Sequence, residues 1–233
     1  MKLYLDDRVT RYILQRKRDE FATADAERIA GPLHASDLSQ CLRKTVRSRR
    51  GDRPPLDSET LLRFSAGFAI QEWWLGAEEE SELIDGVLYS TDARIKHGVF
   101  EFKTTRYGFE KYAKEGSKYL KDEPKIQFVP LPEWVIRCRM YCAAFNIPTA
   151  HIVVYFITSA DMHTWTLEFT PDELMETFAN VSDARGNVES HLEDGSSLPT
   201  VSTRVDDREC TYCLFFNDCQ DELIADGWKE PPK

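Results

Sequence analysis

The sequence contains no run of about 18 consecutive apolar residues, so a membrane-spanning helix is not expected. The first 17 residues carry too many charges for a secretory signal peptide. Internal repeats and low-complexity tracts are also missing, which argues against a solenoid or an extended disordered chain. With 233 residues, 42% of them hydrophobic, the chain can bury one substantial core, and we expect a soluble cytoplasmic protein with no membrane partner.

Positively charged residues are also fewer than negatively charged ones. Lys and Arg number 30 against 40 Asp and Glu, and the formal net charge of −10 argues against a surface that coats nucleic acid by bulk attraction. A basic groove on an acidic body is still compatible with this charge. The best candidate for phosphate contact is a basic run, although such a run is also typical of a solvated face. Its members are Arg43, Lys44, Arg47, Arg49, Arg50 and Arg53.

The order of predicted elements indicates a mixed α/β core. Periodicity and capping signals predict helices over about 3–29, from Ser36 or Asp37 to Arg50, over 59–80, over 132–147 and from Thr170 to about Leu192. Strands are predicted around a hairpin near 97–98, over 151–157 and over 164–169. The helix over 59–80 should be largely buried, because it carries Leu61, Leu62, Phe64, Phe68, Trp73, Trp74 and Leu75.

The most informative stretch joins Asp92 to Glu101-Phe102-Lys103. In a strand, Glu101 and Lys103 project to one face. A two-residue turn at His97-Gly98 would place Arg94 opposite Glu101 and put Asp92 diagonally beside it on the same face. Two carboxylates could then hold a hard divalent cation, with an ammonium alongside. The alternative is an exposed hairpin with a solvated charged face.

One acid, Glu72, lies in the apolar middle of the predicted helix over 59–80. If it is buried it needs a partner or a metal, since an isolated buried carboxylate is costly. Otherwise it points to solvent. Farther along, the Lys- and Tyr-rich segment 108–125 combines charges and aromatic rings that suit single-stranded nucleic acid, although a plain surface loop explains it equally well.

Six cysteines in a cytoplasmic chain suggest metal binding or burial before disulfides. Cys210, Cys213 and Cys219 lie within ten residues, a density typical of a metal site that needs a fourth ligand. We assign Cys41 as that ligand, because its polar, basic segment offers no packing reason for a cysteine. Cys138 and Cys142 lie in an apolar helix and are expected to be buried. Zinc and an iron–sulfur cluster both fit this spacing.

These motifs resemble the RecB-like branch of the PD-(D/E)XK nucleases, in particular the iron–sulfur CRISPR-associated exonucleases and AddB-type nuclease domains. The resemblance runs from about His34 to Cys219 and rests on HASDLSQCLRK, TD at 91–92, EFK at 101–103 and CTYCLFFNDC. It implies an α/β, restriction-endonuclease-like core with a mixed central sheet flanked by helices. The implied organisation is a helical region over 1–60, a nuclease core over 61–195 and a cysteine-rich tail over 196–233.

The resemblance also implies ligands and roles. A [4Fe–4S] cluster would be held by Cys41, Cys210, Cys213 and Cys219, and would join the two ends of the chain. Mg²⁺ or Mn²⁺ would be held by Asp92 and Glu101, with Glu72 as a further candidate ligand. Lys103 would assist the attacking water, and Tyr141 with Arg137 would contact the substrate backbone.

Two positions depart from the family pattern, since Gln71 stands where a His is usual and Arg137 where a Gln is usual. The expected function is a metal-dependent DNA exonuclease acting on single strands or DNA ends, with CRISPR-adaptation or recombination and repair proteins as candidate partners. The alternative is a non-catalytic nucleic-acid-binding or adaptor subunit that keeps the fold and the cluster.

Overall fold

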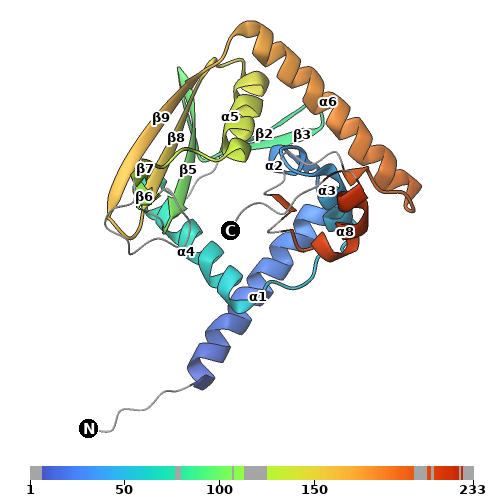
Figure 1. Ribbon diagram of the computed structural model, residues 1–233, viewed down its shortest axis with the longest axis horizontal. Coiled ribbons are helices and arrows are strands. Elements are labelled where there is room, and N and C mark those ends of the chain that lie inside the picture. The colour runs from blue at the N-terminus through green and yellow to red at the C-terminus, as the bar shows by residue number, and fades with distance from the viewer. Residues whose placement is uncertain are drawn as a thin grey trace.

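The computed structural model describes residues 7–76, 80–106, 108–112, 125–201, 209–210, 213–225 and 227. These residues form a mixed α/β structure in which helices flank two mixed sheets (Figure 1). The fold class expected from the order of elements is therefore confirmed at this level. Within the described part of the chain, no helix is both long and apolar enough to cross a membrane.

The central sheet has the order β4-β5-β8-β9. Its strands are β4 (Ala93–Ile95), β5 (Gly98–Thr105), β8 (Thr149–Phe156) and β9 (Asp161–Glu168). The β5–β8 pair is parallel, whereas β4–β5 and β8–β9 are antiparallel. Ile152, Val154 and Phe156 are fully buried on alternate positions of β8, so one face of this sheet carries the main core.

Two smaller sheets accompany it. The first has the order β1-β3-β2 and comprises β1 (Leu33–His34), β2 (Glu80–Ile84) and β3 (Val87–Thr91). The second is an antiparallel pair of β6 (Glu110–Tyr112) and β7 (Lys125–Gln127). Most of the Lys- and Tyr-rich segment of the sequence, residues 113–124, lies outside the described residues.

Helix α5 (Pro132–Phe145) connects β5 to the parallel strand β8 and packs on the buried face of the sheet. It begins with proline in its first turn, as predicted, and buries Cys138 and Cys142 completely. Helix α6 (Pro171–Asp194) packs against α5. Its predicted capping box is present, because Thr170 Oγ1 accepts from the Glu173 N–H at 3.3 Å and Glu173 Oε2 accepts from the Thr170 N–H at 2.8 Å.

Helix α4 (Ser58–Leu75) differs from expectation. It packs on β5 and on the long N-terminal helix α1 (Asp7–Ala30), and of its apolar residues named above only Leu61 is buried. Exposure of the others ranges from 38% at Leu75 to 81% at Trp73. The expected burial was wrong because the apolar side chains of α4 project on all sides of the helix. The strand β5 and the helix α1 cover only part of its circumference (Figure 1).

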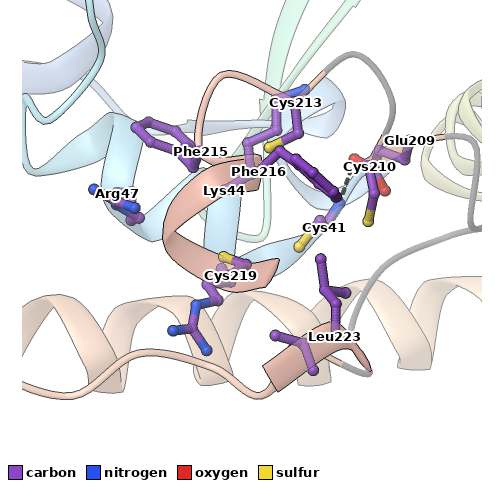
Figure 2. A pocket seen from close by; sticks show the side chains of 12 residues that line it. Cys41, Lys44, Arg47, Glu209, Cys210, Cys213, Phe215, Phe216, Cys219 and Leu223 are labelled. Carbon is purple, nitrogen blue, oxygen red and sulfur yellow. Dashed lines mark hydrogen bonds between the residues drawn. The ribbon is translucent and has the colours of Figure 1, made fainter. Parts of the chain in front are cut away.

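The segment around α3 lies against the C-terminal part of the described chain (Figure 1). The predicted helix from Ser36 to Arg50 is split into α2 (Ala35–Leu38) and α3 (Leu42–Arg49), with Cys41 as N-cap of α3. The Cys41 N–H donates to Glu209 Oε1 at 2.7 Å (Figure 2). Arg43 donates to both carboxylate oxygens of Glu222, at 2.7 and 2.8 Å, on α8 (Phe216–Ala225). The α3 segment and the cysteine-rich tail are thus joined by these bonds, whereas the join expected from the sequence was a cluster held by cysteines.

The arginines of the basic run point inward or along the surface to protein partners, which corrects the expectation of a phosphate-binding face. Arg47 pairs with Asp218 and lies 4.3 Å over the ring of Phe215. Arg50 donates to backbone carbonyls in and just after α6, at 2.6 and 2.7 Å, and Arg53 donates to Asp25 at 2.9 Å. A helical charge pattern cannot reveal such partners, because they come from distant segments.

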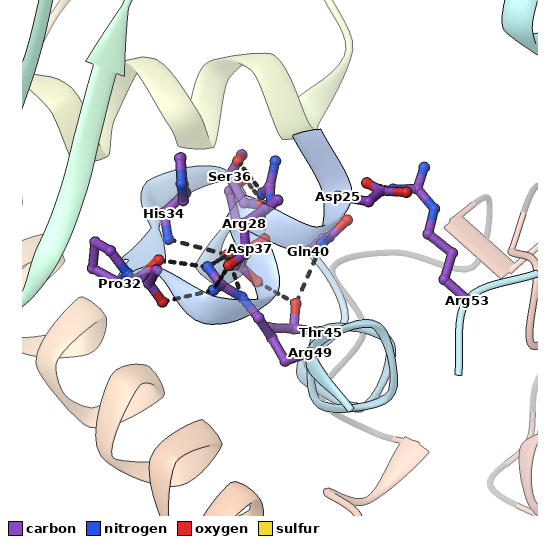
Figure 3. Close-up of polar contacts among 12 residues, drawn as sticks. Asp25, Arg28, Pro32, His34, Ser36, Asp37, Gln40, Thr45, Arg49 and Arg53 are labelled. Atoms are coloured by element: carbon purple, nitrogen blue, oxygen red, sulfur yellow. Dashed lines mark hydrogen bonds and ion pairs between the residues drawn. The ribbon is translucent and has the colours of Figure 1, made fainter. Parts of the chain in front are cut away.

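Arg49 forms the most enclosed of these contacts (Figure 3). It donates to Asp37 Oδ2 at 2.5 Å and to the carbonyls of Gly31 and Pro32 at 3.0 and 2.6 Å. Arg28 also pairs with Asp37. Burial raises the pKa of Asp37, but the two arginines lower it more, so its pKa lies below the ordinary value. This junction fixes the end of α1 to α2 and α3.

We expect Asp37→Asn to lower the free energy of unfolding by about 3–5 kcal/mol, because it leaves the buried Arg49 guanidinium without its counter-charge. Glu20→Gln is the control, since the ion pairs of Glu20 on α1 are exposed and their loss should change the stability far less. Urea unfolding measures both. The stabilisation that Asp37 contributes is fully present above its ordinary pKa of 3.8 and is lost as the pH falls through its lowered folded-state pKa. The variant lacks this carboxylate, so its free energy of unfolding should fall less on acidification. Equal effects of the two substitutions would contradict this role.

Candidate active site

The β4–β5 hairpin determines which side chains meet. Its turn is Lys96–His97, with Ile95 paired to Gly98 and Arg94 paired to Val99. The predicted turn at His97-Gly98 and the predicted pairing of Arg94 with Glu101 were therefore wrong. The register differs by two residues, however, and an even shift keeps every side chain on the same face. Asp92 consequently remains on the same face of the hairpin as Glu101, which a cation site shared by the two carboxylates requires.

Gly98 pairs with Ile95 as the first residue of β5 and does not have a positive φ. A Cβ atom at this position would lie 3.0 Å from two ring atoms of His151 on β8. Glycine is thus required for close packing between the strands rather than for a left-handed turn. The sequence pattern alone does not separate these two uses of glycine.

Asp92 lies between β3 and β4, where the regular pairing of β4 with β5 has ended. Its Oδ2 accepts the N–H of Phe102 at 2.5 Å, and its Oδ1 accepts from Gln71 Nε2 at 2.6 Å. The carboxylate therefore satisfies a backbone donor at the edge of β5 and is held from the other side by α4. These two bonds fix its orientation toward the strand.

Glu101 is 2% exposed on β5. Its Oε1 is 2.7 Å from Lys103 Nζ and 3.0 Å from Arg137 Nη1 of α5. Lys103 Nζ also lies 3.9 Å from Asp92 Oδ2. A carboxylate at this depth requires opposite charge, which these two cations supply. Burial lowers the pKa of Arg137, but the interactions with Glu101, Tyr141 and Asp92 together outweigh that effect, so the pKa is raised.

The structure thus brings together Asp92, Glu101 and Lys103, the three residues singled out in the sequence. It places two other candidates differently. Glu72 is exposed, and its neighbour Gln71 is the α4 residue that reaches Asp92. Tyr141 is only 4% exposed, in the core beside Tyr89, and burial raises its pKa well above the ordinary value. This depth suits support for Arg137 one turn earlier in α5 better than the expected contact with substrate.

The carboxylate pair has the donor chemistry of a divalent-cation site, since Mg²⁺ prefers oxygen ligands. Among the described residues, no three His, Cys, Asp or Glu side chains lie close enough together to hold one metal ion. Among the described residues, the carboxylate ligands at this site would therefore be Asp92 and Glu101, with other oxygen atoms, including water and substrate oxygens, completing the coordination. Such sparse protein ligation is usual for Mg²⁺.

The four cysteines assigned from the sequence surround a second site. Cys41, Cys210, Cys213 and Cys219 all line one cavity, with their sulfur atoms around its interior (Figure 2). Arg43, Lys44 and Arg47 also line it, so positive charge is available to thiolates. Burial raises the pKa of Cys219 while Arg43 opposes the rise. A group bound by four thiolates fits this donor set.

Comparisons with known proteins bear on the fold. No protein-family model matches the chain, and no curated protein is significantly similar to it. The crystal structure of SSO0001 has 18% sequence identity and a TM-score of 0.57, over 92% of this chain and 98% of that chain. At this identity the likeness shows a shared fold.

Two crystal structures of LHK-Exo, an alkaline exonuclease from Laribacter hongkongensis, are more distant. The complex with dAMP has a TM-score of 0.44 and covers 73% of this chain and 93% of that chain, at 14% identity. The other has a TM-score of 0.42 and covers 72% and 93%, also at 14% identity. A TM-score below 0.5 does not establish a common fold, so of these three structures SSO0001 is the one that bears on the architecture.

The two cysteine environments predict different thiol reactivity. In cofactor-free protein at about pH 8, we expect iodoacetamide to modify Cys41 and Cys213, which are partly exposed, well before Cys138 and Cys142. Both α5 thiols are fully buried, and burial raises the pKa of Cys142 to about 12 and that of Cys138 still higher, so little reactive thiolate forms. Peptide mass spectrometry measures the order. Equally fast labelling of the α5 thiols in the folded protein would contradict the burial that we describe.

Proposed function

We propose that this chain is a metal-dependent deoxyribonuclease of the RecB-like PD-(D/E)XK type, acting on single-stranded DNA or DNA ends. The observation that carries the proposal is the convergence of Asp92, Glu101 and Lys103, in which the lysine ammonium lies 2.7 and 3.9 Å from the two carboxylates. Two acids and one lysine at a strand edge are the groups needed for metal-assisted phosphodiester hydrolysis. The fold shared with SSO0001 is compatible with this chemistry but does not specify it.

Each residue has a role that its position permits. A divalent cation held by Asp92 and Glu101 would polarise the scissile phosphate and lower the pKa of a bound water. Lys103 would orient the attacking water and offset negative charge that develops on the phosphate. Gln71 would keep Asp92 oriented through the 2.6 Å bond to Oδ1. Arg137, with 25% of its side chain exposed, would supply a further positive charge beside Glu101.

We further propose that the cysteine-lined cavity holds a [4Fe–4S] cluster with a structural role. Its four thiols come from both ends of the chain, and the bonds from Arg43 to Glu222 and from Cys41 to Glu209 already join these ends. Zinc also accepts four thiolates, and the choice of an iron–sulfur cluster rests on the resemblance of the CTYCLFFNDC tail and of Cys41 to the iron–sulfur nucleases.

One observation favours the alternative, a nucleic-acid-binding or adaptor subunit without catalysis. Lys103 and Arg137 both contact Glu101 Oε1 and together neutralise the carboxylate, so a cation has to compete with them for this oxygen. The catalytic proposal therefore requires that added Mg²⁺ or Mn²⁺ produce cleavage. Binding of single strands without metal-dependent cleavage would favour the adaptor.

Glu101→Gln should reduce metal-dependent degradation of labelled single-stranded DNA by more than about 100-fold, because the amide keeps the shape but loses the charge that holds the cation. The matched control is Glu168→Gln, an exposed acid at the end of β9 that should retain full activity. Degradation at fixed Mn²⁺ concentration measures both, and the unfolding midpoint checks the fold. Near-native turnover in Glu101→Gln would refute the assignment.

Cys41→Ser should remove the brown colour and most of the iron from protein purified without oxygen, in which we expect about four irons per chain. It should also lower the unfolding midpoint, because formation of the site and folding are coupled. Cys138→Ser is the control and should keep its iron, since that thiol lies in the core beneath the sheet. A colourless wild-type protein with one zinc would refute the cluster. Retained iron in Cys41→Ser, with loss in Cys138→Ser, would show that the fourth ligand is wrong.

A further inference from the structure

The charged groups of the candidate active site are balanced in number. Asp92 and Glu101 supply two negative charges, and Lys103 and Arg137 supply two positive charges, both of them within 3.0 Å of Glu101 Oε1. A divalent cation is attracted by the net negative charge of its site, because the energy between two ions is proportional to the product of their charges. Arg137 thus removes the net charge that two acids and one lysine would otherwise offer to the cation.

Arg137 is held less firmly than a structural arginine of the same protein. Arg49 is 5% exposed and bonds to Asp37 and to three backbone carbonyls. The side chain of Arg137 is 25% exposed and bonds, among the described residues, to Glu101 Oε1 at 3.0 Å. Its Nε is buried without a hydrogen-bond partner in the same part of the chain. Because a guanidinium carries five N–H donors, that of Arg137 can bind a further oxygen.

Lys103 is the second cation on Glu101, and its position is more restricted. Its Nζ donates to the carbonyl of Phe102 at 2.9 Å, and it lies 2.7 Å from Glu101 Oε1 and 3.9 Å from Asp92 Oδ2. Arg137 is therefore the cation that can leave Glu101 at lower cost. A guanidinium also pairs well with phosphate oxygens, since its planar fork matches their geometry.

We propose that Arg137 couples the binding of a divalent cation to the binding of a phosphodiester. In the absence of substrate, its guanidinium pairs with Glu101 and weakens the binding of the cation. When a phosphodiester binds, the guanidinium pairs with a phosphate oxygen, and the Glu101 oxygen becomes available to the cation. The coupling is reciprocal, so the cation raises the affinity for the phosphodiester by the same factor. This inference rests on the proposed function, since it states how the substrate of that site controls its metal.

Binding of Mn²⁺ tests the coupling without cleavage, in the full chain purified without oxygen. The electron paramagnetic resonance signal of free Mn²⁺ gives the affinity. Without DNA, we expect Arg137→Gln to bind Mn²⁺ at least about tenfold more tightly than wild type, because one nearby unit charge has about this effect on a divalent ion even when screened as in water.

A single-stranded phosphorothioate oligo(dT) of about 12 nucleotides serves as the substrate analogue, because it keeps the negative charges and resists hydrolysis. At saturating oligomer, after subtraction of the Mn²⁺ that the oligomer binds alone, wild type and Arg137→Gln should bind Mn²⁺ with similar affinity. A methylphosphonate oligomer has the same bases without the charges, and it should leave the difference between the two proteins in place.

Two variants serve as controls. Arg137→Lys keeps the positive charge and should bind Mn²⁺ as weakly as wild type, which separates the effect of charge from a change in the fold. Arg63→Gln also removes one positive charge, from a side chain on α4 that is 52% exposed and pairs with Glu59, and it should keep the wild-type affinity. The unfolding midpoint of each variant checks the fold.

Equal Mn²⁺ affinity of wild type and Arg137→Gln without DNA would overturn the inference. So would an unchanged affinity of wild type on addition of the phosphorothioate oligomer, a result that depends on no variant. Mn²⁺ binding by neither protein would refute the metal site of the proposed function as well. The expected affinities, in a wild-type protein that cleaves no DNA, would refute the nuclease and support the role of Arg137.

Discussion

The burial of the Glu101 carboxylate is the constraint on which the candidate site depends. At 2% exposure, its charge has to be balanced by protein groups, and Lys103 and Arg137 provide the balance from β5 and α5. Because Arg137 belongs to α5, this charge balance fixes α5 beside β5, the strand that carries Glu101 and Lys103. Asp92 links α4 to the same strand, since its carboxylate accepts hydrogen bonds from a backbone N–H of β5 and from the Gln71 side chain of α4. The site is thus held between a helix on each side of the sheet.

A second set of ion pairs joins α3 to α8. Arginines from α3 reach acids on α8 across 171 and 179 residues of sequence, next to the cavity lined by four cysteines. These arginines therefore act as structural cross-links and support the cavity instead of forming a nucleic-acid-binding face.

Helix α4 shows how far hydropathy can mislead. Its many apolar residues suggested a buried helix, yet one side rests on β5 and α1 while Trp73 on another side faces solvent. The same geometry replaces the expected Glu72 by Gln71 at the site, because adjacent helical positions differ by about 100° and only one can face Asp92.

The sequence by itself determined the features that depend on a few neighbouring residues. Strand alternation put Glu101 and Lys103 on one face, the Thr170 capping box and the proline of α5 placed helix starts, and apolar surroundings identified the buried Cys138 and Cys142. Tertiary structure alone decided the hairpin register at Gly98, the choice of Gln71 over Glu72, and the partners of the arginines. Each of these is set by contact with a segment remote in sequence, and a local pattern contains no information about which remote group will supply the counter-charge or fill the space.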